Sequence, residues 1–386
     1  MAMSLNRDQA AELARLTGVS DAERLASQVK DCGFDEHAYL DRHADLRRAG
    51  LDPRLALFHF LTYGYGEDRD IVCGPLGDGL AALASLAMPN RDYSARLFRS
   101  IFFAQLSNPA TEAGLWDRTD GGLIDCIIAK GGLPYIVIGD SHVSHYRRRG
   151  WLGERWFAPL CFVCHAASAM GLENEASRTG HGARILRWAE TAGHQQRDIP
   201  VFLKFGGLDA EFAWMSRQLR DGIRRFSRAG FEEFARRSVA RYGMFLDRLR
   251  RFIGAERMRV CSVFPTALTD ERWMDGFVWA NAGSPDHAMR LAAALRQMEV
   301  PDLHVRTALR ASYNTMARAM CAAKGLPFVD DFTPLIGPDG VLASSFFPRE
   351  PNDHHLDFVA TEHILVAIIR SHTCPSPALT EQRLTH

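Results

Sequence analysis

The sequence has no long hydrophobic run. Its longest apolar stretches, such as residues 358–369, are interrupted by polar side chains including Glu362 and His363. A membrane-spanning helix needs about 20 predominantly apolar residues, so no membrane span is expected. The first fifteen residues carry Asp8 and Glu12 and lack an apolar core, so no secretory signal is predicted there. These absences favour a soluble intracellular protein.

An excess of charge of one sign is also missing. The 386 residues include 46 Lys and Arg and 46 Asp and Glu, which gives a formal net charge of zero. Proteins whose main partner is a nucleic acid usually carry a clear basic excess. No nucleic-acid partner is therefore expected. The one local basic run, residues 147–149, is typical of a solvated helix end.

The eight cysteines are scattered and form no spacing typical of a disulfide framework. Such usage suits the reducing cytoplasm, where we expect the protein to lie. Cys161 and Cys164 make a C-x-x-C pair, but they belong to an apolar segment and have no further zinc ligands at suitable spacing. This context predicts small core residues in a buried strand.

Length and composition allow one large domain and a small accessory module, because 47% of 386 residues are hydrophobic. Residues 7–30 follow a helical pattern, and Gly50 and Pro53 separate further short helices. The predicted division is a helical module over 1–75, a connecting region over 76–130, an α/β domain over 131–375 and a flexible tail over 376–386.

The N-terminal segment beginning Phe34-Asp35 and closing near Arg69 has regularly placed aromatic and glycine residues, including Tyr39 and Gly64. It resembles a short helical module found beside bacterial glycosyltransferase and surface-glycan domains. The resemblance covers about forty residues and implies a glycan context, with association with glycan-assembly enzymes. An α-helical packing unit without a binding function is the alternative.

From residue 134 onward, apolar strands alternate with helices. This alternation predicts an α/β fold with a mostly parallel sheet covered by helices on both faces, a three-layer architecture. Reactive groups in such sheets collect at the carboxyl ends of the strands. The expected strands are 135–138, 160–164, 201–204, 259–263 and 327–329, and the expected helices are 231–253, 305–324 and 358–372.

The first motif with chemical potential is Gly139-Asp140-Ser141-His142, which follows the strand 135–138. A helix is predicted from about residue 143, so Ser141 would lie at a helix N-terminus. The free N–H groups and positive dipole there would favour a developing oxyanion. The alternative is that Asp140 or Ser141 is only a helix N-cap.

The second motif is the loop 352–357, which carries Asn352, Asp353, His354 and His355 before the last helix. A nucleophilic serine needs a base that takes its proton and a group that orients the base. This loop offers imidazoles next to carboxylates. Adjacent histidines also suit a metal, but a metal site needs further ligands, and none is expected.

Two other segments follow predicted strands. Gly206-Gly207-Leu208-Asp209 comes after the strand 201–204, and its glycines permit close approach of the backbone to a ligand. Small residues around Ala166 follow the strand 160–164 and would let a backbone N–H face the serine.

The joint order of these four motifs resembles the SGNH (GDSL-like) hydrolase superfamily over residues 134–372. An uncharacterised bacterial branch is most similar, because residues 171–174 and 177–179 also match its middle motif. The resemblance implies that Ser141 is the nucleophile and His355 the general base. It places the backbone N–H groups of Ser141 and Ala166 in the oxyanion hole, with Gly207 and Asn174 as further donors.

The sequence departs from the superfamily at two positions. Asn352 stands three residues before the histidine, where the superfamily has Asp, and either Asn352 or the adjacent Asp353 could orient the base. Leu208 replaces an Asn whose side chain usually contacts the oxyanion. Support from neighbouring side chains is expected at Asp140, His142 and Asp209.

Three functions fit the resemblance. The first is an esterase that removes an acyl group, expected to be acetyl, from a carbohydrate or surface glycan and requires no cofactor. The second is an O-acyltransferase that uses the same serine and a donor such as acetyl-CoA. The third is a catalytically inactive protein that binds or assembles glycans.

Overall fold

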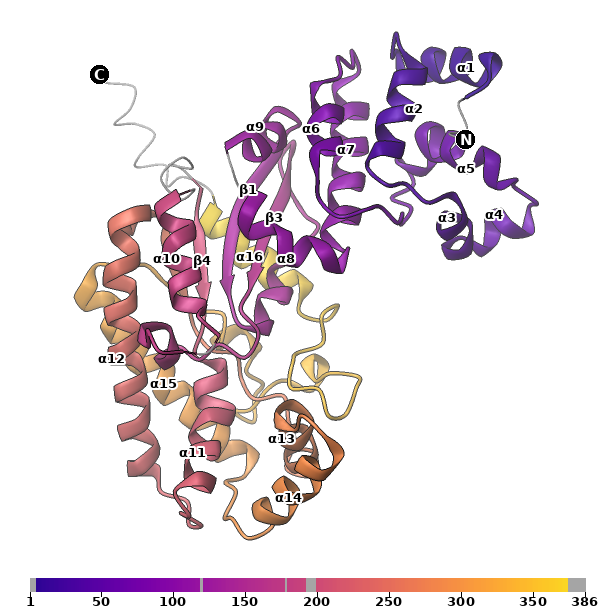
Figure 1. Ribbon diagram of the computed structural model, residues 1–386. Coiled ribbons are helices and arrows are strands. Elements are labelled where there is room, and N and C mark those ends of the chain that lie inside the picture. The colour runs from indigo at the N-terminus through magenta and orange to yellow at the C-terminus, as the bar shows by residue number, and fades with distance from the viewer. Residues whose placement is uncertain (1–4, 119–120, 178, 192–198, 374–386) are drawn as a thin grey trace, which may run out of the picture. The chain divides into compact units, whose positions relative to one another are not determined.

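The computed structural model describes residues 5–118, 121–177, 179–191 and 199–373 (Figure 1). The tail predicted over 376–386 lies outside the described residues. The chain divides into two compact units. Unit 1 comprises Met1–Pro134 and Arg149–Ala158, and unit 2 comprises Tyr135–Arg148 and Pro159–His386. The predicted connecting region 76–130 thus belongs to the same unit as the helical module.

Unit 1 is largely helical. The predicted helix over 7–30 is two helices, because Gly18 ends the first in the left-handed conformation and Asp21 caps the start of the second. Most of the described residues in the predicted connecting region 76–130 form helices. The elements are α1 (Arg7–Thr17), α2 (Ala22–Asp31), α3 (Glu36–Arg42), α4 (Ala44–Arg48), α5 (Pro53–His59), η1 (Phe60–Gly64), α6 (Asp78–Ser85), α7 (Arg91–Leu106), α8 (Pro109–Arg118) and α9 (Gly121–Ala129).

The aromatic residues of the N-terminal motif build the core of their own module. The ring of Phe34 lies 5.3 Å from that of Phe60 and 5.6 Å from that of Tyr39. The Tyr39 hydroxyl lies 3.0 Å from Nδ1 of His59. A Cβ at Gly64 would overlap this hydroxyl, so glycine is required there. The motif is therefore explained by packing.

The sheet has six strands in the order β2-β3-β1-β4-β5-β6. The pairs β1–β4, β4–β5 and β5–β6 are parallel, which confirms the predicted mostly parallel sheet. The short β2 pairs antiparallel with β3 and was not predicted. The bounds are β1 (Gly132–Gly139), β2 (Trp151–Leu152), β3 (Arg155–Val163), β4 (Val201–Lys204), β5 (Met258–Cys261) and β6 (Phe328–Val329).

Strand β3 begins at Arg155, five residues before the predicted strand 160–164, and it includes Pro159. Proline normally argues against a strand interior, since it lacks the N–H that a ladder requires. Residues 156–163 are all buried nevertheless. The final residue of the predicted strand, Cys164, follows β3 and is buried, and Cys161 within β3 is buried as predicted.

The helices of unit 2 include two long ones close to their predicted bounds. Helix α12 packs against α10 and α15, and α12 and α15 are seen side by side in Figure 1. The last helix begins at Glu362, later than the predicted residue 358, because turns occupy the preceding residues. The elements are η2 (Ser141–Tyr146), η3 (Met170–Glu173), α10 (His181–Thr191), η5 (Asp209–Ala213), α11 (Trp214–Arg220), α12 (Arg228–Ile253), η6 (Ala255–Arg257), α13 (Trp273–Asn281), α14 (Pro285–Leu295), α15 (Leu303–Lys324), η7 (Thr333–Leu335), η8 (Ser344–Phe346) and α16 (Glu362–Thr373).

Within the ranges described above, none of the helices combines the length and the apolar character that a bilayer crossing demands.

A buried ion pair lies at the carboxyl ends of the central strands. Lys204, the last residue of β4, is 3% exposed, and Asp331, just after β6, is fully buried. Lys204 Nζ donates to Asp331 Oδ2 over 2.6 Å and to the carbonyl of Ser262 over 2.5 Å. The Tyr146 hydroxyl also donates to Asp331 Oδ2, over 2.6 Å. The pair thus ties β4, β6 and the end of η2 together.

Removing one partner of this pair should strongly destabilise unit 2. Lys204→Met leaves the Asp331 carboxylate buried without its countercharge, which costs about 3–5 kcal/mol. Lys324→Met is the matched control, because Lys324 pairs with Asp247 at a partly exposed site worth at most about 1 kcal/mol. Urea unfolding followed by circular dichroism measures both. Equal losses in the two variants would contradict the structural role of Lys204.

Candidate functional site

Ser141 stands at the point where the buried strand β1 ends. A Cβ at Gly139 would overlap the backbone of β4, so only glycine lets the chain turn there. The Asp140 side chain caps the following helix by accepting the backbone N–H of His142 over 3.0 Å. That helix, η2, is a six-residue 3₁₀ helix that begins at Ser141, slightly before the predicted start near residue 143. It therefore supplies a weaker dipole than expected.

The loop 352–357 brings His355 to the serine. His355 Nε2 lies 2.7 Å from Ser141 Oγ, and its Nδ1 lies 2.6 Å from Asp353 Oδ1. Although burial opposes it, the hydrogen bonds from His355 lower the pKa of Asp353 to about 2. Asp353 is therefore ionised at neutral pH and accepts the Nδ1 proton, which leaves the lone pair of Nε2 facing the serine hydroxyl.

Asn352 does not take the orienting position that the superfamily pattern would give it. Its Oδ1 is buried and has no hydrogen-bond partner among the described residues. The backbone N–H of His355 donates to Asp353 Oδ1 over 2.9 Å, so this one carboxylate oxygen contacts both the backbone nitrogen and Nδ1 of His355. In the structure the His355 ring is thus hydrogen-bonded to Asp353, the second of the two candidates.

The same three-residue turn occurs a second time in the site. Asp140 Oδ1 accepts both the backbone N–H of His142 over 3.0 Å and its Nδ1 over 2.8 Å. The segments 140–142 and 353–355 are therefore two Asp-x-His turns in which each Asp fixes the His two residues later. The two imidazoles lie 4.9 Å apart between ring centroids. The sequence contains this Asp-x-His spacing at both places, but its repetition was not used to predict the site.

His142, His354 and His145 surround His355. The ring of His354 lies 4.1 Å from that of His355, and the His145 ring lies 6.3 Å from it. Burial lowers the pKa of His142, lowers that of His354 to about 3 and brings that of His145 well below its usual range. All three imidazoles are therefore neutral at physiological pH. His142, His354 and His355 also offer nitrogens within 4.8 Å of one another, close enough to hold a metal ion.

Asp209 supports the loop that follows β3. It is fully buried, which raises its pKa despite several hydrogen bonds. Its carboxylate accepts the backbone N–H groups of Ala169 over 2.6 Å and of Met170 over 3.2 Å, and the hydroxyl of Ser238 over 2.7 Å. Asp209 thus fixes the backbone of the loop after β3 at Ala169 and Met170.

Ala166 in this loop has a left-handed backbone, with φ of 56°. For a residue with a side chain this conformation costs about 1–2 kcal/mol, and such strain concentrates at functional sites. The sequence predicts that the backbone N–H of Ala166 is an oxyanion donor. The left-handed backbone marks the same residue as unusual within this loop.

The two glycines after β4 serve the turn and the packing of the site. Gly206 has φ of 101°, and a Cβ there would lie 2.7 Å from the ring of Tyr313. A Cβ at Gly207 would lie 3.3 Å from both Asp140 Oδ2 and the His142 ring. Gly207 therefore lies directly against the Asp140–His142 pair. The close approach predicted for a ligand is made to these side chains.

Leu208 stands where the superfamily has an Asn that contacts the oxyanion, and Asn174 is the further donor suggested by the sequence. The surroundings of neither residue resemble those of an oxyanion donor. Leu208 packs against the apolar cluster that includes Phe212 and Trp214. Asn174 is exposed, and its Oδ1 accepts the backbone N–H of Ala176 in its own turn over 3.2 Å. The side-chain oxygen of Asn174 is thus engaged within its own loop, at an exposed position.

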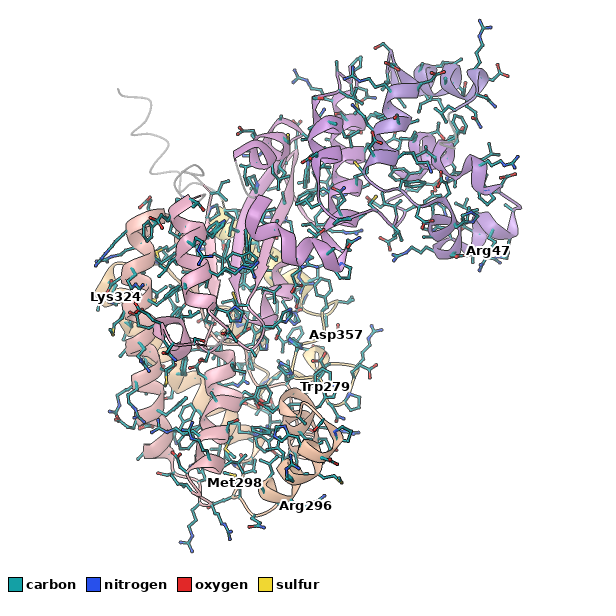
Figure 2. The ribbon with its side chains drawn as sticks, in the orientation of Figure 1. Arg47, Trp279, Arg296, Met298, Lys324 and Asp357 are labelled. Carbon is teal, nitrogen blue, oxygen red and sulfur yellow. The ribbon has the colours of Figure 1, made fainter. Side chains whose placement is uncertain are left out.

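An apolar rim borders the histidines. Trp279 projects from α13 (Figure 2) with 62% of its surface exposed, and its ring lies 6.3 Å from that of His354. Phe358 and Val359 are 46% and 65% exposed, and the Phe358 ring lies 6.1 Å from that of His145. Trp279 was not among the residues predicted for the site. Its position two residues after the buried Phe277 places it on another face of the helix, and this spacing is the feature of the sequence that could have indicated its exposure.

Comparisons with known proteins give little. No protein-family model matches the chain, and no curated protein matches it. Two solved structures are similar in part. A "putative acylhydrolase" from Bacteroides fragilis is 10% identical, with a TM-score of 0.34 over 62% of this chain and 88% of its own. A "putative platelet activating factor" from Streptococcus pneumonia is 12% identical, with a TM-score of 0.37 over 68% and 91%. At these TM-scores the likeness assigns neither a family nor an activity.

The orienting hydrogen bonds can be detected directly. Two ring Nδ1 protons, those of His142 and His355, should resonate far downfield in spectra of protein labelled with ¹⁵N-histidine, because each is held by a carboxylate. Asp353→Asn should remove the resonance of His355, while Asn352→Ala should preserve both. The opposite pattern would show that Asn352 orients the ring.

Proposed function

We propose that this protein is a serine esterase that removes a small acyl group from a carbohydrate. The observation that carries the proposal is the continuous hydrogen-bonded chain from Ser141 Oγ through His355 to Asp353. A nucleophile, a base and an orienting acid within hydrogen-bond reach of one another are what acyl transfer through serine requires.

In the first half-reaction, Ser141 Oγ attacks the ester carbonyl carbon while its proton passes to His355 Nε2. The resulting imidazolium is stabilised by the Asp353 carboxylate. The tetrahedral intermediate then breaks the bond to the alkoxy group, which takes the proton from His355 and leaves as an alcohol. Ser141 retains the acyl group as an ester.

In the second half-reaction, water gives a proton to His355 Nε2 and attacks the same carbonyl carbon. The intermediate expels Ser141 Oγ, which recovers the proton, and the free acid leaves. The backbone N–H groups of Ser141, Ala166 and Gly207 are the donors we propose for the oxyanion. The left-handed backbone of Ala166 supports this role, and Leu208 contributes no polar side chain.

The nature of the alcohol is inferred from the rim. An exposed tryptophan beside His354, the neighbour of the proposed base His355, suits the apolar face of a sugar ring, and the resemblance of the N-terminal module to glycan-associated modules points the same way. An O-acyltransferase would use the same serine, but it would take the acyl group from a donor such as acetyl-CoA, release the thiol, and pass the acyl group to a sugar hydroxyl in place of water. The inactive alternative rests on two departures, at Asn352 and at Leu208. The hydrogen bond between Asp353 and His355 argues against the first, and the second still supports that alternative.

Labelling with a fluorophosphonate and turnover of p-nitrophenyl acetate test the proposal. Ser141→Ala should abolish labelling, and both Ser141→Ala and His355→Gln should lower kcat on the order of 10⁴-fold or more, because the two residues act as a unit. Ser144→Ala is the matched control, since Ser144 is on the same helix η2, and should keep the activity within about threefold. Labelling and turnover that do not depend on Ser141 would exclude both esterase and acyltransferase.

The sugar platform has its own test. Trp279→Ala should raise KM for an acetylated oligosaccharide about 3- to 10-fold, as expected for an aromatic contact of about 0.5–1.5 kcal/mol, and leave turnover of p-nitrophenyl acetate almost unchanged. Trp279→Phe should restore part of the affinity. Equal losses on both substrates would mean that Trp279 supports the fold of the site and does not bind a sugar.

A further inference from the structure

Three of the histidines in the site are arranged as metal ligands. One nitrogen from each of His142, His354 and His355 lies within 4.8 Å of the others. A tetrahedral zinc ion with bonds of about 2.0–2.1 Å holds its ligands roughly 3.3 Å apart. Modest rotation of the rings closes this difference, and His354 belongs to a partly exposed loop.

The hydrogen bonds around these imidazoles match the outer shell of a zinc site. Metal-bound histidines almost always donate their other ring nitrogen to a carboxylate, a carbonyl or water. His142 Nδ1 pairs with Asp140 and His355 Nδ1 pairs with Asp353. In both residues Nε2 is therefore the nitrogen that remains for a metal.

His354 provides an independent observation. Its Nδ1 is buried without a hydrogen-bond partner among the described residues, although a buried polar nitrogen normally has one. The ring centroids of His354, His142 and His355 form a triangle with sides of 5.6, 4.9 and 4.1 Å. A cation shared by the three rings would account for this nitrogen.

We propose that His142, His354 and His355 bind a divalent transition-metal ion, with Zn²⁺ as the expected occupant, and that this ion inhibits the esterase. The inhibition rests on the proposed function. His355 Nε2 has one lone pair, which either accepts the Ser141 proton or coordinates the ion. Three imidazoles would leave a fourth zinc position open, and Ser141 Oγ lies 2.7 Å from the His355 nitrogen that would bind the ion. Metal binding and proton transfer are therefore mutually exclusive.

Cobalt binding tests the site without any assay of activity. Protein treated with EDTA and then titrated with Co²⁺ should develop the visible absorption of tetrahedral cobalt at one equivalent, and Zn²⁺ should displace it. His354→Gln should weaken Co²⁺ binding at least about 10-fold. His304→Gln is the matched control, because His304 is an exposed histidine at the start of α15, and should bind as the wild type does.

Inhibition is then measured on p-nitrophenyl acetate. Saturating Zn²⁺ should lower the rate at least about 10-fold, EDTA should restore it, and His354→Gln should raise the inhibitory concentration of Zn²⁺. Absence of the cobalt spectrum in the wild type overturns the site, and Zn²⁺ that activates the enzyme overturns the inhibition. A normal cobalt spectrum without any Ser141-dependent labelling would leave the metal site standing and disprove the esterase instead.

Discussion

The buried ion pair of Lys204 and Asp331 is the constraint on which the site is built. Two charges are removed from water at the carboxyl ends of β4 and β6, where only mutual attraction and added hydrogen bonds can offset the loss of hydration. Tyr146 and Ser262 supply those bonds from the segments that follow β1 and β5. These contacts therefore join the segments at the ends of four strands, β1, β4, β5 and β6. The turns that carry Ser141 and Gly206-Gly207 follow β1 and β4.

The imidazoles of the site differ from this charged pair in that three of them carry no charge. His142, His145 and His354 are neutral because burial removes the charged form. A neutral, poorly hydrated surrounding strengthens the interaction of His355 with Asp353. The site therefore combines carboxylates at Asp140 and Asp353 with three imidazoles that carry no charge.

Much of the fold follows from the sequence, and the failures have physical causes. Strand β4 and helix α15 lie within two residues of their predicted bounds because their apolar pattern is regular. Strand β3 was shortened because Pro159 normally excludes a strand. Helix α7 was not predicted because it is buried on nearly all sides between Leu97 and Leu106 and so shows no amphipathic period.

The site was predictable in its parts but not in its contacts. Ser141 and His355 follow from their places before a helix, whereas the choice between Asn352 and Asp353 depends on the direction of a loop backbone, which one residue of offset reverses. Asn174 could not be placed because its turn is stabilised locally. Trp279 belongs to a helical insertion between β5 and α15 whose position no local pattern encodes.

The placement of Asp353 and His355 on one short turn reduces the number of parts that must be aligned. In a triad spread over three loops, two separate long-range distances have to be maintained. In the site proposed here, Asp353 and His355 lie two residues apart on one turn, and the hydrogen bond between His355 and Ser141 joins segments far apart in the chain. The pairing of the proposed base with its acid is therefore set by the turn itself and does not depend on the packing of distant loops.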